Sequence, residues 1–176
     1  MKPASKVAMC GICSALSVLL LFFGGVVTIF AYICPMLTGI IMIVLVTTFG
    51  YSSAWVTYFV TSVLSFFLVP DKECMLMYVL FFGYYTIIRL VLAKIKPRIV
   101  QIFVKILLFN AALAAVNLIL FYVFGIPFSS AQDGAWVIIV FWIAMNVFFL
   151  LYERLLGILD VVYKQRIEKR IKRIMK

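Results

Sequence analysis

The stretch Val7–Pro70, VAMCGICSALSVLLLFFGGVVTIFAYICPMLTGIIMIVLVTTFGYSSAWVTYFVTSVLSFFLVP, is 64 residues long and contains no charged side chain. A helix needs about 20 consecutive apolar residues to cross the hydrocarbon core of a bilayer. The stretch is therefore long enough for two generous spans or three tight ones. Its length and apolar character predict a polytopic membrane protein, whose backbone polar groups are satisfied within helices.

The composition of the whole chain supports this prediction. Of 176 residues, 67% are hydrophobic and 12% are charged, which is far outside the range of soluble globular domains. We expect one transmembrane domain over residues 1–160 and a basic juxtamembrane tail over 161–176. The absence of histidine excludes bis-histidine haem, the usual zinc sites and histidine general-base chemistry. We expect neither a metal nor another cofactor.

The net charge of +10 reports the orientation of the spans rather than binding to nucleic acid. Basic residues gather before the first apolar segment, over 94–105 and over 164–176, whereas Lys72 stands apart. Lys2 and Lys6 imitate the start of a signal peptide. Because no cleavage signal precedes a polar segment, we expect the first apolar segment to remain as a span.

Glycine, proline and polar clusters divide the apolar sequence into six predicted helices. These are residues 7–23, 36–50, 53–69, 76–94, 103–125 and 136–159. The second is short, so a re-entrant segment is the alternative to a crossing. If all six cross, both termini and the 95–102 loop are cytoplasmic, in agreement with the positive-inside rule. If 36–50 does not cross, that loop and the tail lie outside, so we predict an all-α protein with six crossings.

The linkers between these helices differ in character. Residues 24–35 are too apolar for a solvated loop, and we expect them to cap the outer face or to enter a cavity. Residues 126–135 form the polar outer loop. The tail 161–176 has an apolar stripe and many basic side chains, so it either lies along anionic lipid or continues the sixth helix.

Small residues follow one face of the first helix. Gly11 and Ala15, with Ala8 before them, have the spacing that lets another helix backbone approach closely. This face either docks a partner or packs within the chain's own bundle. Cys10 and Cys13 in the same helix are interpreted as packing residues rather than a redox pair.

Cys34 and Cys74 are predicted near the outer surface, where a disulfide between them is an open alternative. Both positions adjoin the linkers expected at the outer face.

Polar residues inside membrane helices are costly and therefore indicate functional or structural sites. Helical spacing predicts that Tyr78, Tyr85 and Arg89 share a face. Arg89 and Glu153 lie at similar depth and are expected to pair. The pair serves either helix packing or a polar pocket for a small amphipathic ligand. The polar stripes also include Asn110 and Asn117 on the fifth helix and Trp142, Asn146 and Phe149 on the sixth. The pocket would be walled by Tyr84, Tyr85, Phe121 and Trp142.

No acid pair, nucleophile elbow, phosphate-binding glycine loop or nucleotide motif occurs in the sequence. We therefore expect that the protein is not an enzyme. Any ATP-driven function would depend on another chain.

Six short helices, the small-residue face on the first helix and a strongly apolar chain of this length resemble the substrate-binding S components of energy-coupling factor (ECF) transporters. The likeness covers nearly the whole chain. Pro70–Leu90 (PDKECMLMYVLFFGYYTIIRL) and Val104–Asn110 (VKILLFN) are similar to a group of bacterial membrane proteins of this kind. The resemblance implies a multi-pass protein of the bacterial cytoplasmic membrane.

In that family the small-residue face of helix one packs against a T component that is bound to two ATPases. The matching positions here are Gly11 and Ala15, with Ala8. The family binds vitamins or related micronutrients toward the outer side, and residues 24–35, 70–75 and 126–135 would then line the entrance. The resemblance favours substrate contacts from Tyr78, Tyr84, Asn117, Trp142 and Asn146, whereas Arg89, Asn110 and Glu153 lie deeper than a pocket of the family.

These patterns support two functions. The first is a substrate-capturing subunit of an ATP-driven importer. The second is a membrane scaffold of similar architecture, like the rod-shape protein MreD, which binds other membrane proteins through its inner face and basic tail.

Overall fold

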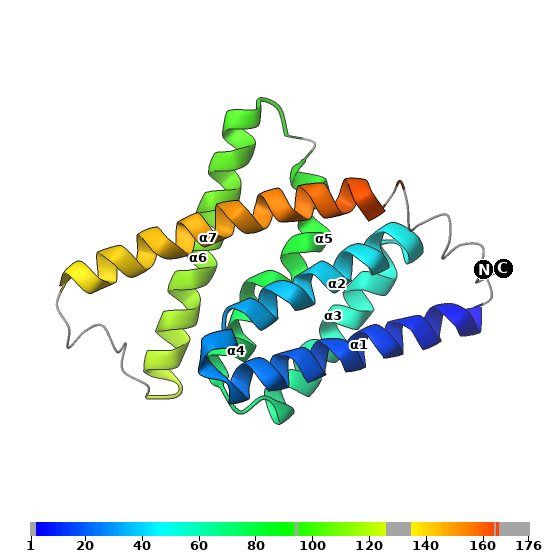
Figure 1. Cartoon of the computed structure of the whole chain (residues 1–176), viewed down its shortest axis with the longest axis horizontal. Helices are drawn as coiled ribbons and strands as arrows, with labels where there is room; N and C mark the ends of the chain where they lie inside the picture. Colours follow the sequence, from blue (N-terminus) through cyan, green and yellow to red (C-terminus); the bar gives the residue numbers. More distant parts are fainter. Residues whose placement is uncertain (1–2, 94, 126–134, 164, 166–176) are drawn as a thin grey trace.

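The computed structural model describes residues 3–93, 95–125, 135–163 and 165, and within these residues the regular elements are all helices (Figure 1). The helix predicted over 76–94 is one continuous helix from Lys72 to Leu92, and it contains one π-helical turn. In chain order the elements are α1 (Pro3–Val26), the short 3₁₀ helix η1 (Thr28–Phe30), α2 (Ile33–Phe49), α3 (Tyr51–Leu68), α4 (Lys72–Met77), the π-helical turn η2 (Tyr78–Phe82), α5 (Gly83–Leu92), α6 (Arg98–Tyr122) and α7 (Ala135–Val162).

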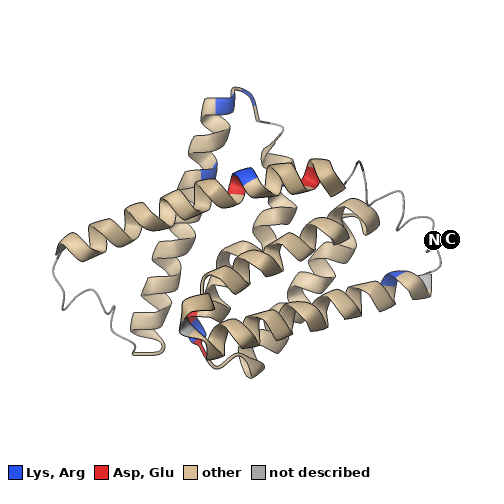
Figure 2. Ribbon diagram, viewed as in Figure 1, with Lys and Arg blue, Asp and Glu red and all other residues tan. Residues whose placement is uncertain are grey.

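In the described part of the chain, five helices are long and apolar enough to cross a membrane, and α2, with 17 residues, is a shorter apolar helix. This confirms the predicted number of helices and the short second one, and it supports a membrane protein. Figure 2 shows that most of each helix is free of charge. Charged residues gather at the start of α4, at the start of α6 and toward the end of α7.

Three predicted helix starts are four or five residues too late. α1 begins at Pro3 rather than at 7. The other two have local reasons. α4 begins at Lys72 rather than at 76, because the Asp71 carboxylate accepts a hydrogen bond from the backbone N–H of Glu73 at 2.9 Å and caps the helix. α6 begins at Arg98 rather than at 103, directly after the extended Pro97. Its first two turns, RIVQIFVK, are mostly apolar, and the basic residues at 98 and 105 hid them within the basic loop.

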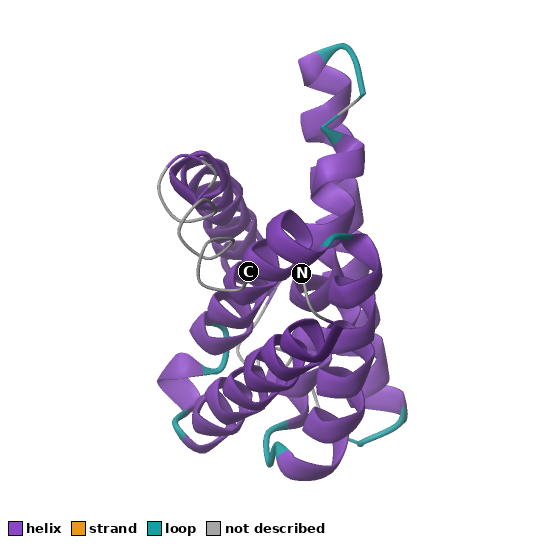
Figure 3. Ribbon diagram, turned by 90° about the vertical axis from the view of Figure 1, so that its right-hand side faces the viewer, coloured by secondary structure: helices purple, strands orange, loops and turns teal. Residues whose placement is uncertain are grey.

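The helices form two groups (Figure 1). α1, α2 and α3 pack against one another, and α5 packs against α2 and α3. α7 crosses α6, and α6 also contacts α4 and η2. The start of α6 and its preceding loop project beyond the other helices (Figure 3). The interior between the groups is aromatic: Phe81 stacks on Tyr85 with ring centroids 4.6 Å apart, and Phe109 stacks on Phe149 at 4.7 Å.

The apolar linker after α1 is folded against the start of α4, as predicted. Ala31 is buried, and the Tyr32 hydroxyl donates a hydrogen bond to the Glu73 carboxylate. Burial, together with the Glu73 charge, raises the pKa of Tyr32, so the hydroxyl remains a donor. A Cβ on Gly24 would lie 2.6 Å from Cβ of Cys34, which shows how closely the end of α1 approaches the start of α2.

All four cysteines lie in described positions and are free thiols, so the alternative of a Cys34–Cys74 disulfide is not present in the structure. Cys10 is half-buried and Cys13 is buried, in agreement with a packing role. The predicted outer loop, apart from Ala135, lies outside the described residues, as does nearly all of the basic tail beyond Tyr163.

Candidate functional site

One carboxylate, on Glu153 of α7, gathers donors from two other helices. The guanidinium Nε of Arg89 on α5 donates to it at 3.0 and 3.1 Å, and the amine of Lys105 on α6 donates at 2.6 Å. The hydroxyl of Tyr85 on α5 donates at 2.6 Å. The predicted Arg89–Glu153 pair is therefore present. We call Tyr85, Arg89, Lys105 and Glu153 the Glu153 cluster.

The Glu153 cluster is largely removed from solvent. The side chains of Lys105, Arg89 and Glu153 are 6%, 15% and 20% exposed. Inside a helical membrane domain, an unpaired charge at such a position is costly, so the three charges depend on one another. Two cations share one carboxylate, and the cluster therefore carries a net positive charge.

Lys105 is absent from the predicted site residues, because its place in the sequence groups it with the basic loop that reports orientation. Since α6 begins at Arg98, Lys105 lies about two turns inside the helix. Pro97 is the signal that could have predicted the start of α6 at Arg98, because helices often begin at or directly after a proline.

A second polar contact joins α6 to α7. Asn110 and Asn146 exchange amide hydrogen bonds of 2.8 and 3.1 Å. Asn110 also donates to the Ile106 carbonyl and Asn146 to the Trp142 carbonyl, both at 2.9 Å. Both side-chain NH₂ groups are therefore fully used within the protein. The predicted inward-facing stripes of these two helices do meet at this pair.

The other predicted amide, Asn117, does not join this contact. Its NH₂ group donates to the Leu113 carbonyl of its own helix at 2.8 Å.

The predicted face of Tyr78, Tyr85 and Arg89 is interrupted. The π-helical turn over 78–82 adds one residue to a turn and rotates the subsequent residues by about 100°. Tyr78 is consequently buried beside Tyr58 of α3, with ring centroids 6.1 Å apart, whereas Tyr85 reaches Glu153 of α7. The prediction that Tyr78 shares this face is wrong for that reason.

The four aromatic residues expected to wall a pocket have different surroundings. Tyr84 packs edge-on against Tyr58 of α3, at 6.1 Å between centroids. Tyr85 is fully buried in the aromatic interior. Phe121 is exposed, and Trp142 is half-buried beside the core. The predicted aromatic wall is therefore not assembled by these four side chains.

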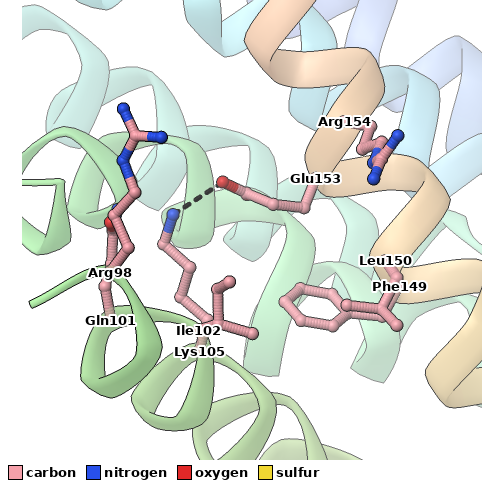
Figure 4. Close-up of a pocket in the computed structure, with 8 residues that line it drawn as sticks. All are labelled: Arg98, Gln101, Ile102, Lys105, Phe149, Leu150, Glu153 and Arg154. Carbon is pink, nitrogen blue, oxygen red and sulfur yellow. Dashed lines mark hydrogen bonds and ion pairs between the residues drawn. The ribbon is translucent and has the colours of Figure 1, made fainter.

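A cavity of about 430 Å³ lies beside the Glu153 cluster, between α6 and α7 (Figure 4). The amine of Lys105 and the Glu153 carboxylate point toward each other within it, and the guanidinium of Arg98 projects from α6 on the same side. We call it the charged cavity. It is lined by Arg98, Gln101, Ile102, Lys105, Phe149, Leu150, Glu153 and Arg154.

A groove of about 430 Å³, almost entirely apolar, lies near the α3–α4 turn and the end of α6. Its residues come from the end of α3, from α4 and η2, and from the end of α6 with the residues just after it. We call it the apolar groove. It is lined by Ser62, Val63, Phe66, Phe67, Met75, Leu76, Val79, Ile119, Val123 and Phe124.

The small-residue face of α1 is exposed. Ala8, Gly11 and Ala15 all point away from the bundle, whose contacts come instead from the opposite face of α1, through residues such as Ser17 and Leu21. Among the described residues, no heavy atom outside α1 lies within 4 Å of a Cβ built on Gly11. Within the described residues, this face therefore does not pack in the chain's own bundle, contrary to that alternative.

Comparison of the chain with protein families, with curated proteins and with solved structures finds no match.

Proposed function

We propose that this chain is the substrate-capturing membrane subunit of an ECF-type ATP-driven importer for a vitamin or similar micronutrient, in the bacterial cytoplasmic membrane. The observation that carries the proposal is the exposed small-residue face of α1. Ala8, Gly11 and Ala15 have no partner helix in the described bundle, and the surface over Gly11 is open. Helices associate in membranes where small residues let two backbones approach closely, so this face suits a second membrane protein.

The ligand of such a subunit is better matched to the apolar groove than to the Glu153 cluster. The Glu153 carboxylate already accepts hydrogen bonds from three side chains of the protein, whereas the apolar groove has a volume of about 430 Å³ and a single hydroxyl, that of Ser62, among its lining residues. Small-molecule pockets are typically of this size and mostly apolar. The groove includes Met75, and Tyr32 of the linker after α1 donates to Glu73 in the same helix, which supports an entrance formed by residues 24–35 and 70–75.

A membrane scaffold is the second candidate. The observation that favours it is the network of polar contacts between α5, α6 and α7, through the Glu153 cluster and the Asn110–Asn146 pair. Contacts of this kind stabilise one helix arrangement, as a scaffold requires. A scaffold would bind other membrane proteins and would need no small molecule.

Purification of the tagged full-length chain from native membranes distinguishes the two. The importer subunit should co-purify with a T component and two ATPases, and its unfolding temperature should rise with one compound in a micronutrient screen. Gly11→Trp should remove the co-purified proteins without changing the unfolding temperature of the isolated chain. Leu16→Trp is the matched control, because Leu16 is exposed on α1 but lies off the small-residue face.

Retention of these partners by Gly11→Trp would contradict the docking role of α1. Co-purification of other membrane proteins, with no ATPase and no stabilising compound, would instead support the scaffold.

A further inference from the structure

The charged cavity between α6 and α7 holds more positive charge than its one carboxylate can neutralise. Arg98 and Lys105 enter its lining from α6, and Arg154 from α7. The only acidic residue among its lining residues is Glu153, which is already shared with Arg89 behind it. Three cations therefore surround a cavity whose single anion is occupied.

Part of this charge is built into the interior. Lys105 is 5% exposed, and its amine is directed at Glu153 on the cavity wall. Gln101, half-buried on the same helix, adds an amide to the lining. A buried lysine at a cavity wall, with a neighbouring amide, is a preformed set of donors for an oxyanion.

The other two cations are exposed and available. In the part of the chain that the structure describes, Arg98 and Arg154 form no ion pair with a carboxylate. They stand at the rim of the cavity, on two different helices. Each guanidinium group can form charge-assisted hydrogen bonds to a phosphate.

The remaining lining is apolar. Phe149 is fully buried, whereas Ile102 and Leu150 are 51% and 44% exposed on the outer surface of α6 and α7. A ligand whose phosphate lies among the cations can therefore extend an apolar part along these two side chains. Basic pockets between transmembrane helices with this construction bind anionic lipid headgroups.

We propose that the charged cavity binds the phosphate of an anionic amphiphile, with the phosphate among Arg98, Lys105 and Arg154 and the apolar part along Ile102 and Leu150. The site does not depend on the proposed transport function. The same phosphate chemistry is offered by a membrane phospholipid or by a soluble phosphomonoester, and a titration with both kinds of compound distinguishes these sources.

The full-length chain is purified in a neutral detergent, stripped of lipid and titrated with phosphatidylglycerol, phosphatidylcholine or glycerol 3-phosphate, and the unfolding temperature gives an apparent dissociation constant. Phosphatidylglycerol should stabilise the protein and phosphatidylcholine should not. The double variant Arg98→Gln/Arg154→Gln should weaken the binding of phosphatidylglycerol by about tenfold or more, because each lost charge-assisted hydrogen bond is strong.

The matched control is Lys6→Gln/Lys96→Gln, which removes two positive charges from α1 and the α5–α6 loop but none from the cavity. Both variants keep the basic tail, so binding at the tail affects them equally. A similar loss in the control and in the cavity variant, or equal stabilisation by phosphatidylcholine, would overturn the proposal. If glycerol 3-phosphate alone reproduces the dependence on Arg98 and Arg154, the phosphate site stands and its ligand is soluble.

Discussion

The amine of Lys105 on α6 donates a hydrogen bond of 2.6 Å to Oε1 of Glu153 on α7, although the two residues are 48 positions apart in the sequence. The same carboxylate accepts from Arg89 of α5, so one side chain joins three helices. Most side chains of α7 are exposed, and only one stripe, which includes Phe149 and Leu156, is buried against the other helices. The position of α7 therefore depends strongly on its polar contacts.

Glu153→Gln should destabilise the protein severely. The substitution preserves the shape of the side chain but leaves Arg89 and Lys105 as uncompensated, largely buried cations. Removing one partner from a buried ion pair typically costs about 3–5 kcal/mol. The free energy of unfolding, measured by denaturant titration in detergent micelles, should fall by an amount in this range.

The control for this substitution is Glu153→Gln combined with Lys105→Met. The double variant removes one of the stranded cations and keeps an apolar stem of similar length, so it should be more stable than Glu153→Gln alone. A loss below about 1 kcal/mol for the single variant, which is the value of a surface ion pair, would show that the Glu153 cluster is effectively solvated.

The reciprocal amide contact of Asn110 and Asn146 predicts a measurable coupling between α6 and α7. A double-mutant cycle with Asn110→Leu and Asn146→Leu should give a coupling energy between about 0.6 kcal/mol, the typical value for a hydrogen bond between membrane helices, and about 1.7 kcal/mol, the upper end of such values. Asn117→Leu is the comparison, because the Asn117 amide donates to its own helix. Its coupling to Asn146→Leu should be close to zero, and an equal coupling would argue against the contact.

Two glycines should respond in opposite ways to alanine. A Cβ on Gly39 of α2 would lie 2.9 Å from the backbone oxygen of Phe82 and would also overlap the Tyr152 hydroxyl, so Gly39→Ala should destabilise by about 1–3 kcal/mol. Gly11→Ala should be neutral or stabilise by up to about 1 kcal/mol, because its Cβ meets no heavy atom outside α1 and alanine favours the helix. Equal effects in unfolding experiments would contradict the packing of α2 against η2 and α7.

The sequence is sufficient to predict six apolar helices, the short second helix and the folded linker, because these features result from hydropathy, breakers and charge. It is also sufficient to predict the Arg89–Glu153 pair, from helix face and depth together. It is not sufficient to place Tyr78, since a single π-helical turn after Met77 changes the face of every later residue in the helix. Such a turn has no reliable signature in the spacing of residues.

Features that depend on how neighbouring helices pack are also not predictable from the sequence. Small residues at Gly11 and Ala15 fit an internal contact as well as an external one, and only the arrangement of α1 against α2 and α3 leaves them exposed. The role of Lys105 also requires the start of α6, which the apolar pattern places too late.

The hydrogen bond from Tyr32 to Glu73 predicts how firmly the linker after α1 is held. Among the described side chains of residues 27–32, Tyr32 makes the only hydrogen bond, and Tyr32→Phe removes it. A hydrogen bond to a charged group is worth about 1.5–3 kcal/mol. Backbone amides of the linker should therefore exchange with solvent deuterium roughly tenfold faster or more, while those of α2 beyond its first turn remain unchanged. Tyr51→Phe is the matched control, because Tyr51 is exposed at the start of α3. If the linker also controls access to the apolar groove, ligand association should accelerate in Tyr32→Phe, whereas unchanged exchange would mean that burial of Ala31 alone holds the segment.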